Sequence, residues 1–182
     1  MNTVIGIQSR SGSTRLPAKA LLPLLDKPIW KWTYDTCMNV RSTLMLIPDN
    51  DALMEESCKE HHADYIRGSE ESPLDRYQKM IKIFHPKFFV RCTSDCPLLS
   101  RILLIDTIEK AEQINSAFLQ LDVDGTDVQV CRVDAFEEKY QDKEHVFNVA
   151  RLKKDGIYTV HTPHFSVDDL DDYKYINRIV RI

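Results

Sequence analysis

The sequence predicts an α/β protein with three layers, α/β/α, around a mostly parallel sheet. Short β-branched or aromatic runs alternate with helical segments over the first 115 residues. Such strand–helix–strand units are right-handed and place their strands side by side in one parallel sheet. The composition, 43% hydrophobic and 29% charged residues, is typical of a globular chain, and 182 residues suit one domain.

The expected elements follow in order along the chain. The strands are Thr3–Ile7, Ser42–Ile47, Tyr65–Ile66, Phe88–Arg91, Asp127–Val133 and Gly156–Thr162. The helices are Lys27–Val40, Ala52–His62, Pro73–Phe84, Ile102–Glu112 and Asp168–Val180. The pattern changes beyond Ala117, so we expect a single domain, 1–182, with one half at about 1–115, the other at about 116–182, and no flexible linker.

Charge and cysteine usage exclude several classes of function. The net charge of −4 argues against a nucleic-acid binder, so phosphate chemistry would need a local basic cluster. No apolar run approaches the length of a membrane span. The five cysteines are odd in number and scattered, and the chain shows no signal peptide. We therefore expect reduced thiols in a cytoplasmic protein.

The basic loop, Gln8–Lys19, follows the first expected strand. It holds Arg10, Arg15 and Lys19 together with four hydroxyl residues and Gly12. Parallel sheets bind ligands beyond the carboxyl ends of their strands, and amides, hydroxyls and cations there suit phosphate. Neither the Walker pattern nor the dinucleotide pattern G-x-G-x-x-G is present. The alternative is a solvated basic loop without a ligand.

The run R-S-G-S-T-R-L-P-A-K-A-L-L-P-L in this loop resembles the signature of the cytidylyltransferases that activate acidic sugars. These include the CMP-sialic acid synthetases, the CMP-KDO synthetases and, most similar, the spore-coat polysaccharide cytidylyltransferases. The resemblance implies a Rossmann-like nucleotidyltransferase (GT-A-like) fold, with the triphosphate of CTP in the basic loop. The implied contacts are Gln8, Ser9, Arg10, Ser11, Gly12, Ser13, Arg15 and Lys19, with Arg10, Arg15 and Lys19 catalytic.

The RGSE segment, Arg67–Tyr77, has two interpretations. By itself it is a loop that enters a helix, with Ser72 as N-cap before Pro73, and it needs no ligand. It also resembles the family's R-G-S-E-x-x-x-L-D-R-Y, which lies near the cytosine and ribose. The implied nucleotide contacts are Arg67, Ser69, Asp75 and Arg76.

Two aspartates are candidate metal ligands. Asp95 follows an apolar strand, a position that suits a Mg²⁺ held by few carboxylates and by phosphate oxygens, although it could instead cap the next helix. Its surroundings resemble the family's R-x-T-x-D-x-P-L, which implies that Asp95 is a catalytic metal ligand and that Arg91 and Thr93 contact the nucleotide. Asp168 matches the first aspartate of V-D-T-P-E-D-L, which completes the family's metal site. The alternative for Asp168 is a solvated helix start.

Residues of the second half resemble the family's acceptor site. D-G-T-D-V-Q-V and E-H-V match D-G-x-D-V-E-V and E-H-V, which implies acceptor contacts at Asp127, Gln129, Glu144 and His145. Gln129 replaces the family's glutamate and so removes a charge. His145 taken alone could equally be structural. The segment between Ile102 and Asp124 is shorter than in relatives, where it contributes to the sugar pocket and to a homodimer contact.

The resemblance implies transfer of CMP from CTP to the hydroxyl of an acidic sugar of the sialic acid or 3-deoxy acid type. Pyrophosphate is released and Mg²⁺ is the cofactor. The partners implied are therefore CTP and an acidic sugar, with a homodimer left open. Two alternatives remain: a nucleotidyltransferase for another nucleotide or a non-sugar acceptor such as a phosphonate, and a nucleotide-binding protein of this fold that has lost turnover.

Overall fold

A seven-stranded sheet forms the centre of the molecule. We describe it from a computed structural model, which covers residues 2–122, 127–137, 156–159 and 166–180. The strands are β1 (Thr3–Gln8), β4 (Ser42–Pro48), β5 (Tyr65–Gly68), β6 (Phe88–Thr93), β7 (Phe118–Asp122), β8 (Val128–Arg132) and β9 (Gly156–Thr159). Their order is β5-β4-β1-β6-β8-β7-β9, and β8 alone among them runs antiparallel to its neighbours.

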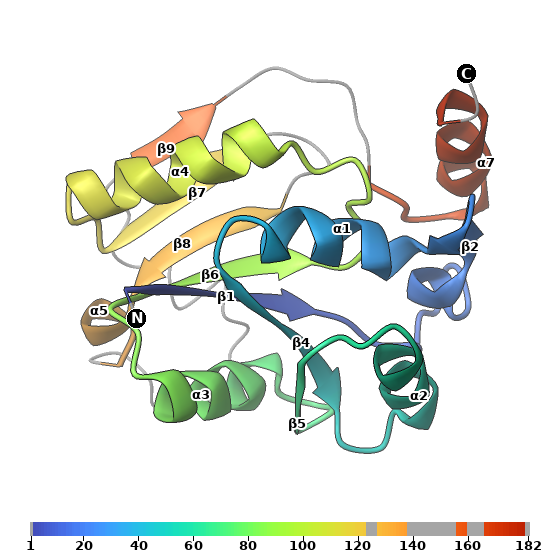
Figure 1. Cartoon of the computed structure of the whole chain (residues 1–182), viewed down its shortest axis with the longest axis horizontal. Helices are drawn as coiled ribbons and strands as arrows, with labels where there is room; N and C mark the ends of the chain where they lie inside the picture. Colours follow the sequence, from blue (N-terminus) through green and yellow to red (C-terminus); the bar gives the residue numbers. More distant parts are fainter. Residues whose placement is uncertain (1, 123–126, 138–155, 160–165, 181–182) are drawn as a thin grey trace.

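Helices cover both faces of this sheet, which confirms the three-layer α/β/α class. Helices α1 (Ile29–Met38), α2 (Ala52–Glu60) and α4 (Arg101–Gln113) contribute to the core on one face. Helices α3 (Pro73–Phe84) and α5 (Val133–Glu137) pack on the other (Figure 1). Helix α7 (Leu170–Ile179) stands beside a hairpin of β2 (Pro23–Leu24) and β3 (Lys27–Pro28), next to the short 3-10 helix η1 (Lys19–Leu21).

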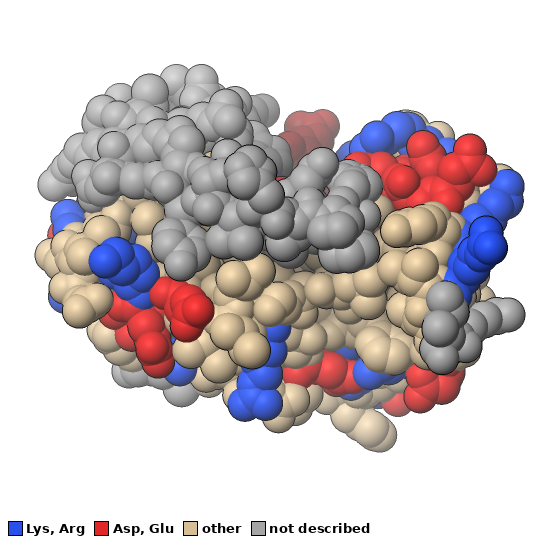
Figure 2. Space-filling view, turned by 90° about the horizontal axis from the view of Figure 1, so that it is seen from above, with Lys and Arg blue, Asp and Glu red and all other residues tan. Residues whose placement is uncertain are grey.

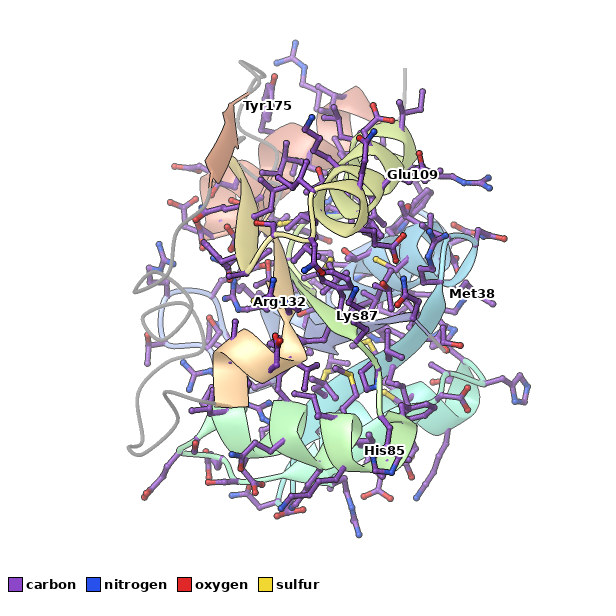
Figure 3. The ribbon with its side chains drawn as sticks, turned by 90° about the vertical axis from the view of Figure 1, so that its left-hand side faces the viewer. Met38, His85, Lys87, Glu109, Arg132 and Tyr175 are labelled. Atoms are coloured by element: carbon purple, nitrogen blue, oxygen red, sulfur yellow. The ribbon has the colours of Figure 1, made fainter. Side chains whose placement is uncertain are left out.

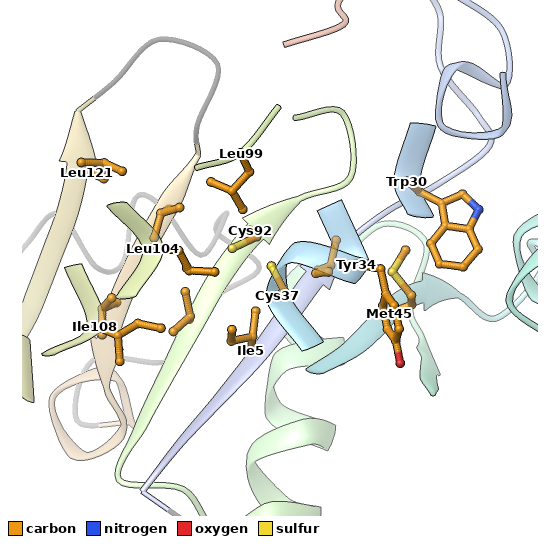
Figure 4. Packing of buried hydrophobic residues seen from close by; sticks show 14 of the residues in the cluster. Ile5, Trp30, Tyr34, Cys37, Met45, Cys92, Leu99, Leu104, Ile108 and Leu121 are labelled. Atoms are coloured by element: carbon orange, nitrogen blue, oxygen red, sulfur yellow. The ribbon is translucent and has the colours of Figure 1, made fainter. Parts of the chain in front are cut away.

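Alternation along the strands produces two separate cores. Ile5 and Ile7 of β1 face α1 and α4, whereas Val4 faces α3. Figure 4 shows the first core, where the thiols of Cys37 and Cys92 lie among apolar side chains. All five cysteines are free and buried, as expected for packed thiols. No helix in the described part of the chain is both long and apolar enough to cross a membrane.

Several boundaries differ from the sequence prediction, and several short elements were not predicted. Lys27 and Pro28 form β3 rather than the first turn of α1, and Pro28 is the N-cap. Strand β7 was not predicted, because Phe118 and Leu119 are buried on opposite faces and no alternation results. Helix α5 was also not predicted; its five residues are too few to show a helical period. The end of the last predicted strand, 160–162, lies outside the described residues.

The sheet has a switch point at β1. Strand β4 lies on one side of β1 and β6 on the other, so the chain leaves both β1 and β6 at the same edge. Gln8 pairs with Thr93 there, and the Ser94 amide donates to the Gln8 carbonyl at 3.2 Å. Lys87 and Arg132 mark the opposite end, where β6 begins and β8 ends (Figure 3). Ligands of such sheets bind at the carboxyl edge beside the switch point.

Candidate active site

A polar cleft of about 280 Å³ opens at this edge. The basic loop forms one side, and the end of β6 with the start of β8 forms the other. Most of the predicted site residues line it: Gln8, Ser9, Arg10, Ser13, Arg15, Lys19, Arg76, Arg91, Thr93, Asp95 and Asp127. Residues from four separate parts of the sequence therefore converge on one space.

Lys19 links the basic loop to both predicted metal ligands. Its Nζ donates to Asp95 Oδ2 at 2.5 Å and to Asp168 Oδ1 at 3.3 Å, and Arg15 reaches Asp168 at 2.7 Å. Partial burial acts to lower the pKa of Lys19, but the two carboxylates outweigh it and raise that pKa. Partial burial acts to raise the pKa of Asp168, but the positive charges of Lys19 and Arg15 outweigh it and lower that pKa. Lys19 and Asp168 are thus held in their charged forms.

Neither aspartate is needed for a helix. Ser100, not Asp95, is the N-cap of α4, which rules out the capping alternative for Asp95. Asp169 and Asp172 form a capping box at the start of α7 and leave Asp168 free to turn toward Lys19. The Val167 amide donates to the Asp95 carbonyl at 2.8 Å, which ties these two distant segments together.

The carboxylates are suited to a divalent cation that also binds phosphate. Asp95 and Asp168 already share one cation, the Lys19 ammonium. Burial is the main cause of the raised pKa of Asp127, and repulsion by Asp95 and Asp168 adds to it. The charge of Arg91 and the bond from Thr93 act to lower this pKa but do not reverse the shift. Among the described residues no three His, Cys, Asp or Glu side chains form a complete metal site. A Mg²⁺ here would complete its shell with water and phosphate oxygens, which is its usual preference.

Asp51 holds the basic loop in place and was not predicted from the sequence. This carboxylate, 8% exposed, accepts from the Ser11 amide at 2.6 Å and from the Ser11 hydroxyl at 2.8 Å. It also caps α2 through the Met54 amide at 3.1 Å. An aspartate before a helix is a recognisable N-cap in sequence, but its second role depends on the contact across 40 residues. Ser11 and Gly12 line a second hollow beside the cleft, and Arg10 borders both.

Most of the RGSE segment pairs within the protein. Arg67 is exposed and bonds to Glu55 at 2.8 Å, outside the cleft lining. Asp75 accepts from the Ser69 amide at 2.8 Å and pairs with Lys79 at 3.1 Å. Ser72 occupies the N-cap position of α3, as predicted, but its side chain makes no capping bond. The structure therefore gives Arg67, Ser69 and Asp75 structural partners and brings none of the three into the cleft.

Arg76 is the member of this segment that reaches the cleft. It is 1% exposed, and its guanidinium donates to the carbonyls of Leu46 at 2.9 Å and Ser9 at 3.3 Å. Burial lowers its pKa, and its Nε has no hydrogen-bond partner in the described structure. The side chain thus joins the ends of β1 and β4 and adds a cation behind the basic loop.

Arg91, Thr93 and Gln129 lie on the other side of the cleft. Arg91 Nε donates to Gln8 at 3.3 Å and Arg91 Nη1 donates to Gln129 at 3.2 Å. Thr93 bonds to Asp127 at 3.4 Å. Gln129 is buried behind Arg91 rather than lining the cleft. Glu144 and His145, the remaining predicted acceptor contacts, lie outside the described residues.

The described surface shows no broad patch of one charge on the face seen in Figure 2, as is expected when the charged groups of a small-molecule site are confined to a cleft. Acidic and basic side chains lie next to one another across the described part of the face in Figure 2, rather than in a broad patch of one sign. A strand order with β4 and β6 flanking β1, and cations and carboxylates at the carboxyl edge, is the arrangement by which α/β proteins bind phosphate-bearing ligands such as nucleotides.

Comparisons with known proteins agree with this class. A profile of the cytidylyltransferase family matches residues 4–177, so the chain belongs to the cytidylyltransferase family. It is similar to the spore coat polysaccharide biosynthesis protein SpsF of Bacillus subtilis, with 28% identity over 210 residues, 98% of this chain and 87% of that protein.

Two solved structures share the fold. A cytidylyltransferase from Leptospira borgpetersenii superposes with a TM-score of 0.84 at 22% identity, over 100% of this chain and 87% of the other. A CMP:2-keto-3-deoxy-manno-octonic acid synthetase complexed with CTP gives 0.79 at 13% identity, over 100% and 99%. At these identities the two likenesses support the fold.

Proposed function

We propose that the chain transfers CMP from CTP to the hydroxyl of an acidic sugar and releases pyrophosphate. Membership of the cytidylyltransferase family sets the type of reaction. The observation that carries the proposal is the convergence of Arg10, Arg15 and Lys19 with Asp95 and Asp168 at the carboxyl edge of β1 and β6. The residues before about 116 would hold the nucleotide, and those after it the acceptor.

Relatives support both substrates. One similar protein is named for spore coat polysaccharide biosynthesis, and one similar structure is a synthetase for an eight-carbon keto acid sugar, complexed with CTP. We extend CTP and an acidic sugar from these to this chain. The five buried free thiols support a reducing, cytoplasmic setting.

The proposed reaction transfers the CMP group, so one bond to the α-phosphorus forms and another breaks. The acceptor hydroxyl oxygen attacks the α-phosphorus of CTP, the bond to the β-phosphate oxygen breaks, and pyrophosphate leaves. Such a transfer depends on positioning and on neutralisation of charge. Arg10, Arg15 and Lys19 would bind the β- and γ-phosphates and stabilise the leaving group. A Mg²⁺ held by Asp95 and Asp168 would supply polarisation of the α-phosphate and a lower pKa for the attacking hydroxyl.

A nucleotide panel tests the proposal first. Thermal shift with CTP, ATP, GTP, UTP and dTTP in the presence of Mg²⁺ should show selective stabilisation by CTP, because a ligand of the native state raises its stability. Pyrophosphate release with 3-deoxy-manno-octulosonate and N-acetylneuraminate then tests turnover. CTP binding without turnover on any acceptor would favour a nucleotide-binding protein without activity. A shift with another nucleotide would favour the other transferase.

Two variants test the mechanism. Arg15→Ala and Asp95→Asn should each reduce pyrophosphate release by orders of magnitude while the fold is retained. Near-full release by both variants would show that the reaction does not use this cleft.

A further inference from the structure

A third apolar core lies outside the central sheet, at the end of the molecule where α7 stands beside β2 (Figure 1). Leu24 of β2, Ile29 of α1 and Ile176 of α7 are buried in it, together with Val167. None of these four side chains belongs to either core of the sheet. The third core therefore attaches α7 to the molecule separately from the packing of the central sheet.

This core takes one apolar side chain from each segment that carries the charges of the site. Leu16 comes from the basic loop, Leu98 from the loop after Asp95, and Val167 from the position directly before Asp168. Packed side chains fix the relative positions of the backbones that carry them, because a close-packed interior leaves little room for movement. The charged groups on the same three segments form the ion pairs of the site. The third core thus helps to assemble this cluster of charges.

Val167 connects the third core directly to the charges. It is fully buried, its amide donates to the Asp95 carbonyl at 2.8 Å, and its carbonyl accepts from Lys19 Nζ at 3.0 Å. Asp168 is the next residue, and its amide donates to Asp172 Oδ2 in the first turn of α7 at 3.0 Å. The backbone of Asp168 is therefore held between the site on one side and α7 on the other.

Helix α7 is held in turn by β2. Tyr173 Oη donates to the Pro23 carbonyl at 2.7 Å, across 150 residues. Within the described part of the chain, this is the one hydrogen bond from α7 to an earlier segment. Ile176 follows Tyr173 by three residues and so lies on the same face of the helix, where it is 1% exposed in the third core. Tyr173 and Ile176 thus dock α7 through one polar and one apolar contact.

We propose that Tyr173 and Ile176 are positioning residues, which hold Asp168 against Asp95 and Lys19 by docking α7 on β2. This rests on the proposed function, in which Asp168 is one of two carboxylates for Mg²⁺. When α7 loosens from β2, Asp168 loses its fixed position and Asp95 loses its partner for the cation. Loss of the docking should therefore weaken the joint binding of Mg²⁺ and CTP more than it weakens the fold.

The variant Ile176→Ala tests this assignment. We expect the Mg²⁺ concentration that gives half of the CTP thermal shift to rise by at least about tenfold, because a cavity in the third core loosens α7. Ile108→Ala is the matched control, since Ile108 is a fully buried isoleucine of α4 in the first core. It should lower the melting temperature without a change in the Mg²⁺ midpoint. An unchanged midpoint in Ile176→Ala, or an equal rise in Ile108→Ala, would overturn the proposal.

Removal of a single hydrogen bond is a milder test. Tyr173→Phe should raise the Mg²⁺ midpoint by roughly threefold, since it removes the bond to Pro23 and keeps the ring in the third core. Tyr77→Phe removes the same kind of bond, which Tyr77 Oη donates to the Gly6 carbonyl at 3.1 Å in the sheet. It should leave the midpoint unchanged. Equal midpoints in the two variants would give Tyr173 no role in the site.

Docking itself can be observed without any ligand. Trp32 Nε1 donates to the Leu24 carbonyl at 3.0 Å in the third core, whereas Trp30 belongs to the first core and donates to Ser57 Oγ at 3.0 Å. In Ile176→Ala the indole N–H resonance of Trp32 should shift, and that of Trp30 should stay at its wild-type position. An unchanged Trp32 resonance would show that α7 does not dock through this core.

A double-mutant cycle shows whether the effect passes through Asp168. In an Asp168→Asn background, Ile176→Ala should change the Mg²⁺ midpoint by less than about twofold, because the carboxylate that it positions is already absent. Additive effects would mean that Ile176 acts by another route and would overturn the proposal. Failure of the proposed function is distinct from this outcome. The wild type would then show no CTP shift at any Mg²⁺ concentration, while the Trp32 resonance would still report the docking.

Discussion

The basic loop and the RGSE segment both carry arginines and both resemble segments of the cytidylyltransferases, yet the structure uses them differently. Arg10 and Arg15 of the loop are exposed at the cleft, and Lys19 joins them there. In the segment, Arg67 pairs with Glu55, and Asp75 binds Ser69 and Lys79. A motif match indicates which segment lies near a site, but the ion pairs and hydrogen bonds within the protein decide which of its charged side chains can face a ligand.

The largest expected difference between these regions concerns Lys19 of the loop and Lys79, which pairs with Asp75 of the segment. Lys19→Met should reduce the rate of pyrophosphate release by roughly 10²–10³-fold, because it removes a cation that we propose binds phosphate and leaves Asp95 and Asp168 to repel each other. Lys79→Met removes a surface ion pair with Asp75 and should change the rate by less than about threefold. Rates measured at saturating CTP compare the two. Equal losses would mean that the loop has no special role.

Asp51 should connect loop geometry to nucleotide affinity. Asp51→Ala removes both bonds to Ser11 and the cap of α2, and we expect the KM for CTP to rise by at least about tenfold as the loop loses its fixed position. Asp51→Asn retains acceptor oxygen and should recover part of this loss. Ser100→Ala removes the cap of α4 alone and is the control for helix capping. If Ser100→Ala raises the KM equally, Asp51 acts only through stability.

Substitution of a glycine should affect stability in the RGSE segment and CTP binding in the basic loop. A Cβ at Gly68 would lie 2.5 Å from Asp75 Oδ2 and 2.7 Å from Arg76 Cγ, so Gly68→Ala should destabilise the fold by about 1–3 kcal/mol. A Cβ at Gly12 would meet nothing within 4 Å, so Gly12→Ala should keep the fold's stability and weaken CTP binding where phosphate is expected. Urea unfolding and CTP thermal shift measure the two effects. Loss of stability in Gly12→Ala would contradict this division.

The smallest effect concerns acid stability at the RGSE segment. Bonds from Lys59, Tyr65 and Arg67 lower the pKa of Glu55 from 4.5 to about 2. A carboxyl with a lowered pKa contributes stability that is complete above its unfolded pKa and is lost as the pH falls through the folded value. The melting temperature should therefore fall between about pH 5 and 2 less steeply in Glu55→Gln than in the wild type.

Glu109→Gln is the control for this pH dependence. Glu109 is exposed on α4 and forms no ion pair with another described residue (Figure 3). Its substitution makes the same change of charge and should leave the slope of melting temperature against pH as in the wild type. Equal slopes for all three proteins would show that the bonds to Glu55 do not contribute to stability.

The sequence by itself determined the α/β class, the helix Pro73–Phe84, most strand cores and the segments that carry the site. Apolar runs, turn residues and short motifs are local, so they can be recognised without knowing the fold. Only the tertiary structure decided which charges meet. Lys19 pairs with carboxylates 76 and 149 residues away, and Asp51 holds Ser11 across 40 residues. The antiparallel β8 sets Gln129 against Arg91. These contacts depend on strand order and register, which bring distant residues together and which no local pattern specifies.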